Sequence, residues 1–415
     1  MSGPDWLAAL FLFIQTDMHP FLLPALFAGF FTAWIILSPI PAILLSAADE
    51  QSCLMIAPGQ RLVQKGEGLE AIRLTRIGSL IGLFILAGLL PLASPIIPTI
   101  HRILAPHLGW MLWCSVAFLA LSERPRSAPT ALSPWNQFIY TMTPVVSGLT
   151  VLVFSGLLGL ILFYQSPIAL NASFINFIPA IIGIFAVPGL IIHVFMPTQD
   201  GSAGTPRPTQ EQKIPEGRMK RPFRAGLSEI RFYFEATACG ALSGMITALI
   251  PALTGTMSGV LTQTLAGTRN ARKQLVAQGV TRMLYYGSGL LLIFLPGTPR
   301  MRSSSAALLC SFYEPSSTQF QLMLAVIAFS AIMAWFLSAV LSKGLINLIA
   351  RHGTRPPSVL ALSGILVFVG ITTSWPGLLV LLTGTGIGML SVMFESRLVQ
   401  GIGVVLIPLA YALTT

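Results

Sequence analysis

Long apolar stretches alternate with shorter polar ones along almost the whole chain. In order, the apolar stretches lie near residues 6–15, 21–48, 74–97, 103–121, 138–164, 174–196, 232–267, 275–296, 319–341, 359–373, 376–394 and 398–413. About 20 consecutive apolar residues suffice for a helix to cross the hydrocarbon core of a bilayer. The pattern therefore predicts an all-α fold, a polytopic transmembrane helical bundle of roughly ten spans.

The composition indicates that lipid surrounds most of this chain. Of the 415 residues, 54% are hydrophobic and only 9% are charged, and the mean hydropathy is +0.79. The net charge of +10 could suggest nucleic acid, but the basic residues stand at the ends of apolar stretches, where they orient a membrane protein. We therefore expect a multi-pass protein of the cell (inner or plasma) membrane, in contact with lipid and without a nucleic-acid partner.

One long polar segment, residues 197–231, divides the chain in two. It is rich in proline and glycine and carries seven lysines and arginines, which predicts a basic cytoplasmic linker. The segments on either side, 1–196 and 232–415, are each interpreted as one transmembrane repeat.

Two matches between the halves support this internal repeat. One motif keeps four identities at a constant spacing: Gly29, Thr32, Ala33 and Ile35 match Gly244, Thr247, Ala248 and Ile250. Further along, a Thr-Arg pair opens the next span in each half, at Thr75-Arg76 and at Thr281-Arg282. Single identities in apolar sequence arise by chance, so it is the shared order that favours a repeat. Internal repeats are common in secondary transporters. The sequence leaves open whether these two are parallel or inverted.

Each half contains one interrupted apolar segment. Residues 21–48 would form a helix about 42 Å long at 1.5 Å per residue, but Ser38-Pro39-Ile40-Pro41 stands near the middle. A proline removes one amide donor, and the freed carbonyl group must find a partner inside protein or water. Residues 248–267 carry Pro251 in the same way. We expect a re-entrant hairpin of two half-helices or an unwound helix in each half; the alternative is that these prolines are ordinary kinks.

Paired interrupted helices at corresponding positions are typical of transport sites. The ends of half-helices present unpaired amide groups and a positive dipole end to an anion, whereas hydroxyl and carbonyl oxygens suit a coupling cation, Na⁺ or H⁺. The predicted substrate-binding residues are Gly29, Thr32, Ser38, Pro39, Pro41, Gly244, Thr247, Pro251, Thr254, Gly255 and Ser258. Asp49, Glu50 and Arg282 are candidates for a coupling-ion site or a gate; the alternatives are a solvated helix start for the two acids and a marker of the inside face for the arginine.

Enzymatic motifs are absent. The five histidines show no HExxH spacing, and the glycine-rich 384–388 lacks the lysine of a phosphate-binding loop. The four cysteines show neither metal-ligand nor disulfide spacing. We therefore expect no catalytic residues, no metal site and no cofactor, and an ion gradient or a partner chain as the driving force.

A family resemblance rests mainly on residues 58–74. Pro58-Gly59-Gln60, followed by GEGLEAIRL at 66–74, resembles a motif of the membrane permease of the tripartite tricarboxylate transporters, particularly of its archaeal-type branch. Residues 34–41 lack the glycine, histidine and asparagine of that branch's first hairpin, so the resemblance is to a divergent member. It implies uptake of carboxylates together with a solute-binding protein and a small membrane subunit.

The resulting prediction is a permease that moves a small organic anion, a carboxylate, by alternating access between the two repeats. One alternative is transport of a polyprenyl or other lipid phosphate through the same hairpins. Another is a membrane subunit of a larger complex without transport of its own.

Overall fold

A computed structural model describes residues 22–123, 133–165, 175–195, 227–250, 253–267, 270–295, 310, 316, 319–394 and 396–414. The first half contains α2 (Leu22–Leu37), α3 (Pro39–Leu45), α4 (Cys53–Val63), α5 (Gly68–Ala93), α6 (Ile97–Leu104), α7 (Leu108–Ser122), α8 (Pro134–Tyr164), α9 (Ile178–Phe185) and α10 (Val187–Phe195). The second contains α11 (Leu227–Leu249), α12 (Gly255–Ala266), α13 (Ala271–Leu291), α15 (Phe320–His352), α16 (Arg355–Met393), η5 (Leu398–Ile402) and α17 (Gly403–Ala412). The described chain contains no strand, which confirms the all-α prediction.

Six described helices are long and apolar enough to cross a membrane, and the bent pair α9 and α10 can make a seventh span. The polytopic bundle is therefore confirmed, while the predicted number of spans stays a prediction. The predicted stretch 6–15 and most of the linker 197–231 lie outside the described residues. α11 begins at Leu227, within the stretch assigned to the linker.

α13 is the central helix of the fold. Sixteen of its 21 residues are buried, and it contacts α2, α4, α5, α11, α12 and α15. Because other helices surround it, α13 can carry four buried polar residues, Gln274, Gln278, Thr281 and Arg282, away from lipid.

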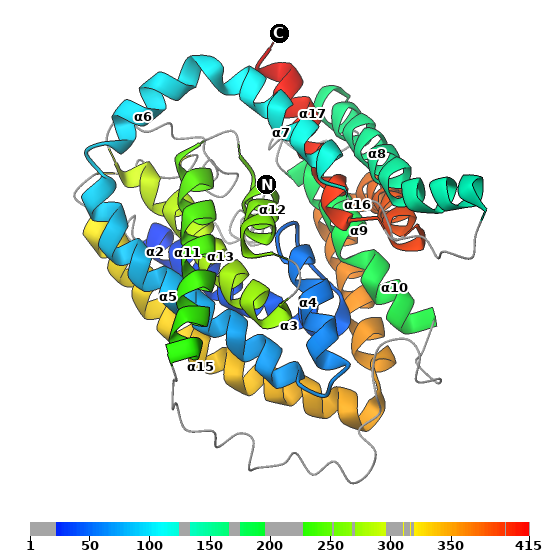
Figure 1. Cartoon of the computed structure of the whole chain (residues 1–415), viewed down its shortest axis with the longest axis horizontal. Helices are drawn as coiled ribbons and strands as arrows, with labels where there is room; N and C mark the ends of the chain where they lie inside the picture. Colours follow the sequence, from blue (N-terminus) through cyan, green and yellow to red (C-terminus); the bar gives the residue numbers. More distant parts are fainter. Residues whose placement is uncertain are drawn as a thin grey trace.

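The helices pack as two groups (Figure 1). One group is α13 with α2, α5, α11 and α15, and the other is α7–α10 with α16 and α17. The short helices α4 and α12 lie between them: Leu54 and Val260 belong to the same apolar cluster as Ala180 and Ile402. Each sequence half contributes to both groups, so the two halves are not the two packing units.

α5 and α13 cross at glycines and run in the same direction. Gly78 lies against Gly279, Gly82 against Met283, and Leu86 against Gly287, so the contacts advance together along both helices. A methyl group added at Gly78 would run into the Val276 carbonyl oxygen, and one at Gly279 into that of Thr75. Glycine at these positions therefore allows the two backbones to approach closely.

The two interruptions differ from the predicted hairpins in one respect. α2 and α3 are broken at Ser38 but together form one span, Pro24–Leu45, so the prolines mark a break and not the reversal. The chain reverses in the loop 46–52, where Ser46 adopts a left-handed conformation (φ 54°), and α4 returns against α3 with Gln60 Nε2 donating to the Ile43 carbonyl oxygen (2.8 Å). In the second half, α11 ends at Leu249 and α12 returns against α13, with Gly255 near Tyr286 and Gly267 near Gln274.

Candidate functional site

An ion pair joins the two halves of the sequence at the break in the first span. The Arg282 guanidinium donates to both carboxylate oxygens of Asp49, with Nη1–Oδ1 3.0 Å and Nη2–Oδ2 2.5 Å. Its side chain is completely buried, and that of Asp49 is 10% exposed. A planar guanidinium that binds a carboxylate through two parallel bonds is the strongest form of this pair.

The proline break explains why Arg282 lies here. Pro39 has no N–H, so the Ile35 carbonyl, four residues earlier, has no helical donor. Arg282 Nε donates to this oxygen (3.1 Å), and Nη2 also donates to Ser38 Oγ (2.6 Å). The guanidinium thus satisfies the backbone group that the proline leaves free, as lipid surroundings require.

Aromatic rings cover the guanidinium. The Trp34 ring centroid lies 4.4 Å and the Tyr286 ring centroid 5.4 Å from Arg282 Cζ, so both rings stabilise the cation. Tyr286 also donates its hydroxyl to Glu50 Oε1 (3.0 Å), and Thr256 Oγ1 donates to the Glu50 carbonyl (3.1 Å). α12 and α13 together therefore hold the acidic loop of the first half.

Two glutamines extend these contacts along α12. Gln51 Nε2 donates to Ser258 Oγ (3.0 Å), and Gln278 Nε2 donates to the Gly259 carbonyl (2.8 Å). We call the whole set the polar junction: Ser38, Asp49, Glu50, Gln51, Thr256, Ser258, Gln278, Arg282 and Tyr286. Glu50, Gln51 and Arg282 are at most 1% exposed, so the centre of the junction is closed to solvent in this conformation.

A chain of hydroxyl groups next to the junction binds α11, α12 and α13 together. Thr262 Oγ1 lies 2.5 Å from Ser243 Oγ and 2.6 Å from Thr281 Oγ1. Thr281 Oγ1 in turn donates to the Gly240 carbonyl (3.1 Å). Such interhelical hydrogen bonds stabilise packing inside a membrane.

The structure brings together some of the predicted site residues. Ser38, Asp49, Glu50, Ser258 and Arg282 belong to the polar junction. Gly255 packs against the Tyr286 hydroxyl, Pro39 and Pro41 lie in α3 just after the break, and Thr254 caps α12 by accepting from the Met257 amide.

Other predicted site residues make contacts outside the polar junction. Thr32 donates to the Ala28 carbonyl of its own helix, and Thr247 donates to Ser243 and Gly244 carbonyls in the same way. Gly244 packs against Leu284. Pro251 lies outside the described residues.

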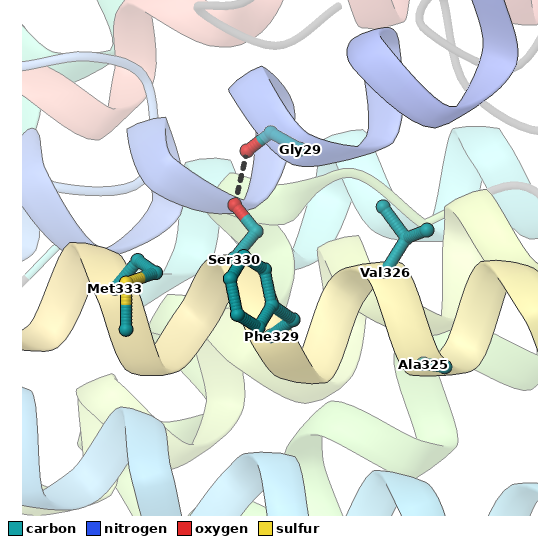
Figure 2. Close-up of a pocket in the computed structure, with 6 residues that line it drawn as sticks. All are labelled: Gly29, Ala325, Val326, Phe329, Ser330 and Met333. Atoms are coloured by element: carbon teal, nitrogen blue, oxygen red, sulfur yellow. Dashed lines mark hydrogen bonds between the residues drawn. The ribbon is translucent and has the colours of Figure 1, made fainter. Parts of the chain in front are cut away.

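Gly29 faces α15 and not the junction. Figure 2 shows its carbonyl accepting from Ser330 Oγ, a bond of 2.6 Å. A cavity of about 470 Å³ opens there, lined by Gly29, Ala325, Val326, Phe329, Ser330 and Met333. Its lining is almost entirely apolar, so it offers little to an anion.

Sequence reasoning missed four site residues: Gln51, Thr256, Gln278 and Tyr286. Gln278 and Arg282 are four residues apart in α13, so they share one face of the helix. A stripe of polar side chains inside an apolar stretch was the signal that could have identified this face.

The Tripartite tricarboxylate transporter TctA family profile matches residues 3–403. The chain belongs to the TctA family. Membership identifies it as the permease component of a tricarboxylate transporter and implies a transport function without catalysis. These systems are tripartite, with a solute-binding protein and a small subunit, and the apolar helices make this TctA-family chain a multi-pass membrane protein. No curated protein and no solved structure matches the chain. The archaeal-type branch stays a sequence-based prediction.

A further buried carboxylate of this TctA-family permease, outside the polar junction, lies at the end of α7. Glu123 accepts from the Arg397 backbone N–H (3.3 Å) and from Gln400 Nε2 (3.3 Å). Burial raises the pKa of its carboxyl above the ordinary 4.5, although these partners oppose the shift. A folded-state pKa above the unfolded one means that the folded chain loses stability as pH rises through the interval between them.

Glu123→Gln is therefore expected to remove a fall in thermal stability that the wild type shows as pH rises above about 4.5. Unfolding temperatures measured from pH 4 to 8 check this, with Glu70→Gln, a half-exposed carboxylate paired with Arg73, as the control. Parallel curves for wild type and Glu123→Gln would refute the assignment.

Proposed function

We propose that this permease carries a small organic carboxylate across the bilayer and binds it at the polar junction. The observation that carries the proposal is the fully buried Arg282, held bidentately by Asp49 between the interrupted helices of the two halves. Ionisable residues at membrane depth are costly, and they commonly mark substrate pathways. A guanidinium fork recognises carboxylates more specifically than an ammonium group does.

Asp49 accepts two hydrogen bonds from the Arg282 guanidinium, as the carboxylate of a substrate would. Binding is then an exchange, in which a substrate carboxylate takes one or both guanidinium bonds and Asp49 keeps its bonds from the Ser52 and Gln51 amides (2.7 and 3.2 Å). Those amide bonds stabilise the displaced carboxylate. The exchange keeps a charged acceptor on Arg282 at every stage, so the buried cation is never left alone.

Transport requires that the closed junction open to each side in turn. α4 and α12 contact both helix groups, so a movement of the second group relative to α13 and its neighbours would expose the junction from one side or the other. This is alternating access between two helix groups, each of which combines segments of both halves. Two repeats in parallel orientation agree with the shared direction of α5 and α13, because inverted repeats would set corresponding helices in opposite directions.

The proposal also covers the location, the partner proteins and the driving force of the transporter. It places the chain in the cell membrane, working with a solute-binding protein and a small membrane subunit and driven by a cation gradient.

A ligand screen tests the substrate class. Di- and tricarboxylates are expected to raise the unfolding temperature of the detergent-purified chain, since a ligand at 100 times its Kd adds about 2.7 kcal/mol of stability. Chloride at matched ionic strength is the control, and uptake of the strongest hit into proteoliposomes is the confirming measurement. Stabilisation by polyprenyl phosphate alone would replace the carboxylate with a lipid phosphate, and carboxylates that neither stabilise the chain nor enter the vesicles would refute the proposal.

A further inference from the structure

Two buried carboxamides in the polar junction have orientations fixed by their partners. Ser258 Oγ gives its only hydrogen to the Gly255 carbonyl (2.6 Å), so it must accept from Gln51, and the atom 3.0 Å away must be the amide nitrogen. The Gly259 carbonyl can only accept, so the Gln278 atom 2.8 Å away is also nitrogen. Exchanging the nitrogen and oxygen positions of either carboxamide would place an acceptor against an acceptor and lose the hydrogen bond.

The amide oxygens of these two side chains are therefore acceptors. Both Oε1 atoms are buried without a hydrogen-bond donor among the described residues, and the two residues are 0% and 1% exposed. Both side chains flank Gly259: a methyl group there would lie 3.2 Å from Gln278 Oε1 and 3.5 Å from Gln51 Cγ. Buried acceptors that lack a donor are unfavourable and are rare in folded proteins.

The kinds of ligand select among cations. The described residues contain no group of three or more histidine, cysteine or acidic side chains that could hold a metal ion, so a transition-metal site has no support here. Amide and hydroxyl oxygens are ligands of hard cations. Divalent hard cations are commonly held by carboxylates, so two neutral amide oxygens in a fully buried site favour a small monovalent ion.

We propose that Gln51 Oε1 and Gln278 Oε1 coordinate one Na⁺ beside Gly259. The inference rests on the proposed transport function for its purpose, since a cation bound between α12 and the loop 46–52 would couple its gradient to closure of the junction around the substrate. The site itself does not depend on which substrate is carried.

An ion series without carboxylate tests the site. NaCl is expected to raise the unfolding temperature of the purified wild-type chain with a saturable dose response, whereas KCl and choline chloride at equal ionic strength do not. Gln51→Met and Gln278→Met each remove one ligand, and each is expected to raise the apparent Kd for Na⁺ by roughly tenfold or more.

Gln274→Met is the matched control. Gln274 lies one turn before Gln278 in α13 and donates the same kind of bond, from Nε2 to the Gly267 carbonyl (2.8 Å). This variant is expected to lose some stability but to keep the wild-type Kd for Na⁺. An equal loss of Na⁺ response in Gln274→Met would overturn the assignment of the ligands.

The wild-type ion series decides the question even where a variant does not fold. Equal stabilisation by Na⁺, K⁺ and choline, or none by any of them, overturns the Na⁺ site. The carboxylate screen separates this result from the proposed function, because carboxylate stabilisation without an Na⁺ effect rejects only the ion site. An Na⁺ effect without any carboxylate response rejects only the substrate assignment.

Discussion

Arg282→Gln is expected to lower carboxylate binding and uptake by roughly 100-fold or more, because two charge-assisted hydrogen bonds to the substrate are lost. The variant also leaves Asp49 buried without its cation. Breaking a buried ion pair from one side costs about 3–5 kcal/mol, so Arg282→Gln and Asp49→Asn are each expected to lower the unfolding temperature. Proteoliposome uptake and thermal unfolding measure the two effects separately.

The double variant Asp49→Asn/Arg282→Gln separates binding from folding. With both charges removed, most of the lost stability is expected to return, while carboxylate binding stays lost. The matched control is Arg76→Gln, because the Arg76 guanidinium also lies over a tryptophan, Trp335, at 4.5 Å, but outside the polar junction. Wild-type uptake by the double variant would show that Arg282 does not bind the substrate.

Gly78→Leu is expected to prevent stable packing of the first helix group. The new side chain would collide with the Val276 carbonyl and lie within 3.2 Å of Gly279 Cα, and backbone cannot move aside as a side chain can. Overpacking a core costs about 1–3 kcal/mol, and the loss here is expected at or above the upper end because α5 and α13 must separate along their length. The yield of monodisperse protein in detergent and its unfolding temperature are the measurements.

Gly88→Leu provides the control in the same helix. A Cβ at Gly88 meets nothing within 4 Å, and the residue is exposed on the bundle surface. The same substitution is therefore expected to be tolerated there. Comparable yields and unfolding temperatures for both variants would refute the close approach of α5 and α13.

Local chemistry allowed the break at Ser38-Pro39 to be predicted from sequence. It did not identify the side chain that donates to the carbonyl group left free by the break. A proline frees a carbonyl wherever it stands in a helix, so the need for a donor at Ile35 follows from the sequence alone. The donor is Arg282, 247 residues away, and no local pattern relates the two. Asp49 and Arg282 were both predicted as functional, yet their pairing depends on how α13 packs against α2.

The threonines illustrate the opposite limitation. Thr32 and Thr247 were predicted to bind substrate because hydroxyl groups in an apolar stretch suggest a polar site. In the structure each bonds to a carbonyl of its own helix, one turn earlier. A threonine can satisfy its hydroxyl in this way in any helix, so residue type alone could not distinguish the two roles.

The central position of α13 has a consequence for how the protein enters the membrane. Its sequence, from Ala271 to Leu291, holds arginines, a lysine and two glutamines, and it is not among the helices apolar enough to be recognised as spans. Each central charge opposes insertion by about 2.5–3.5 kcal/mol, so the translocation machinery would not release α13 into lipid by itself. Because synthesis proceeds from the N-terminus, α5 and the loop bearing Asp49 are made first. We therefore expect the first half of the chain to act during biogenesis as an intramolecular receptor for α13, a helix too polar to enter the bilayer alone.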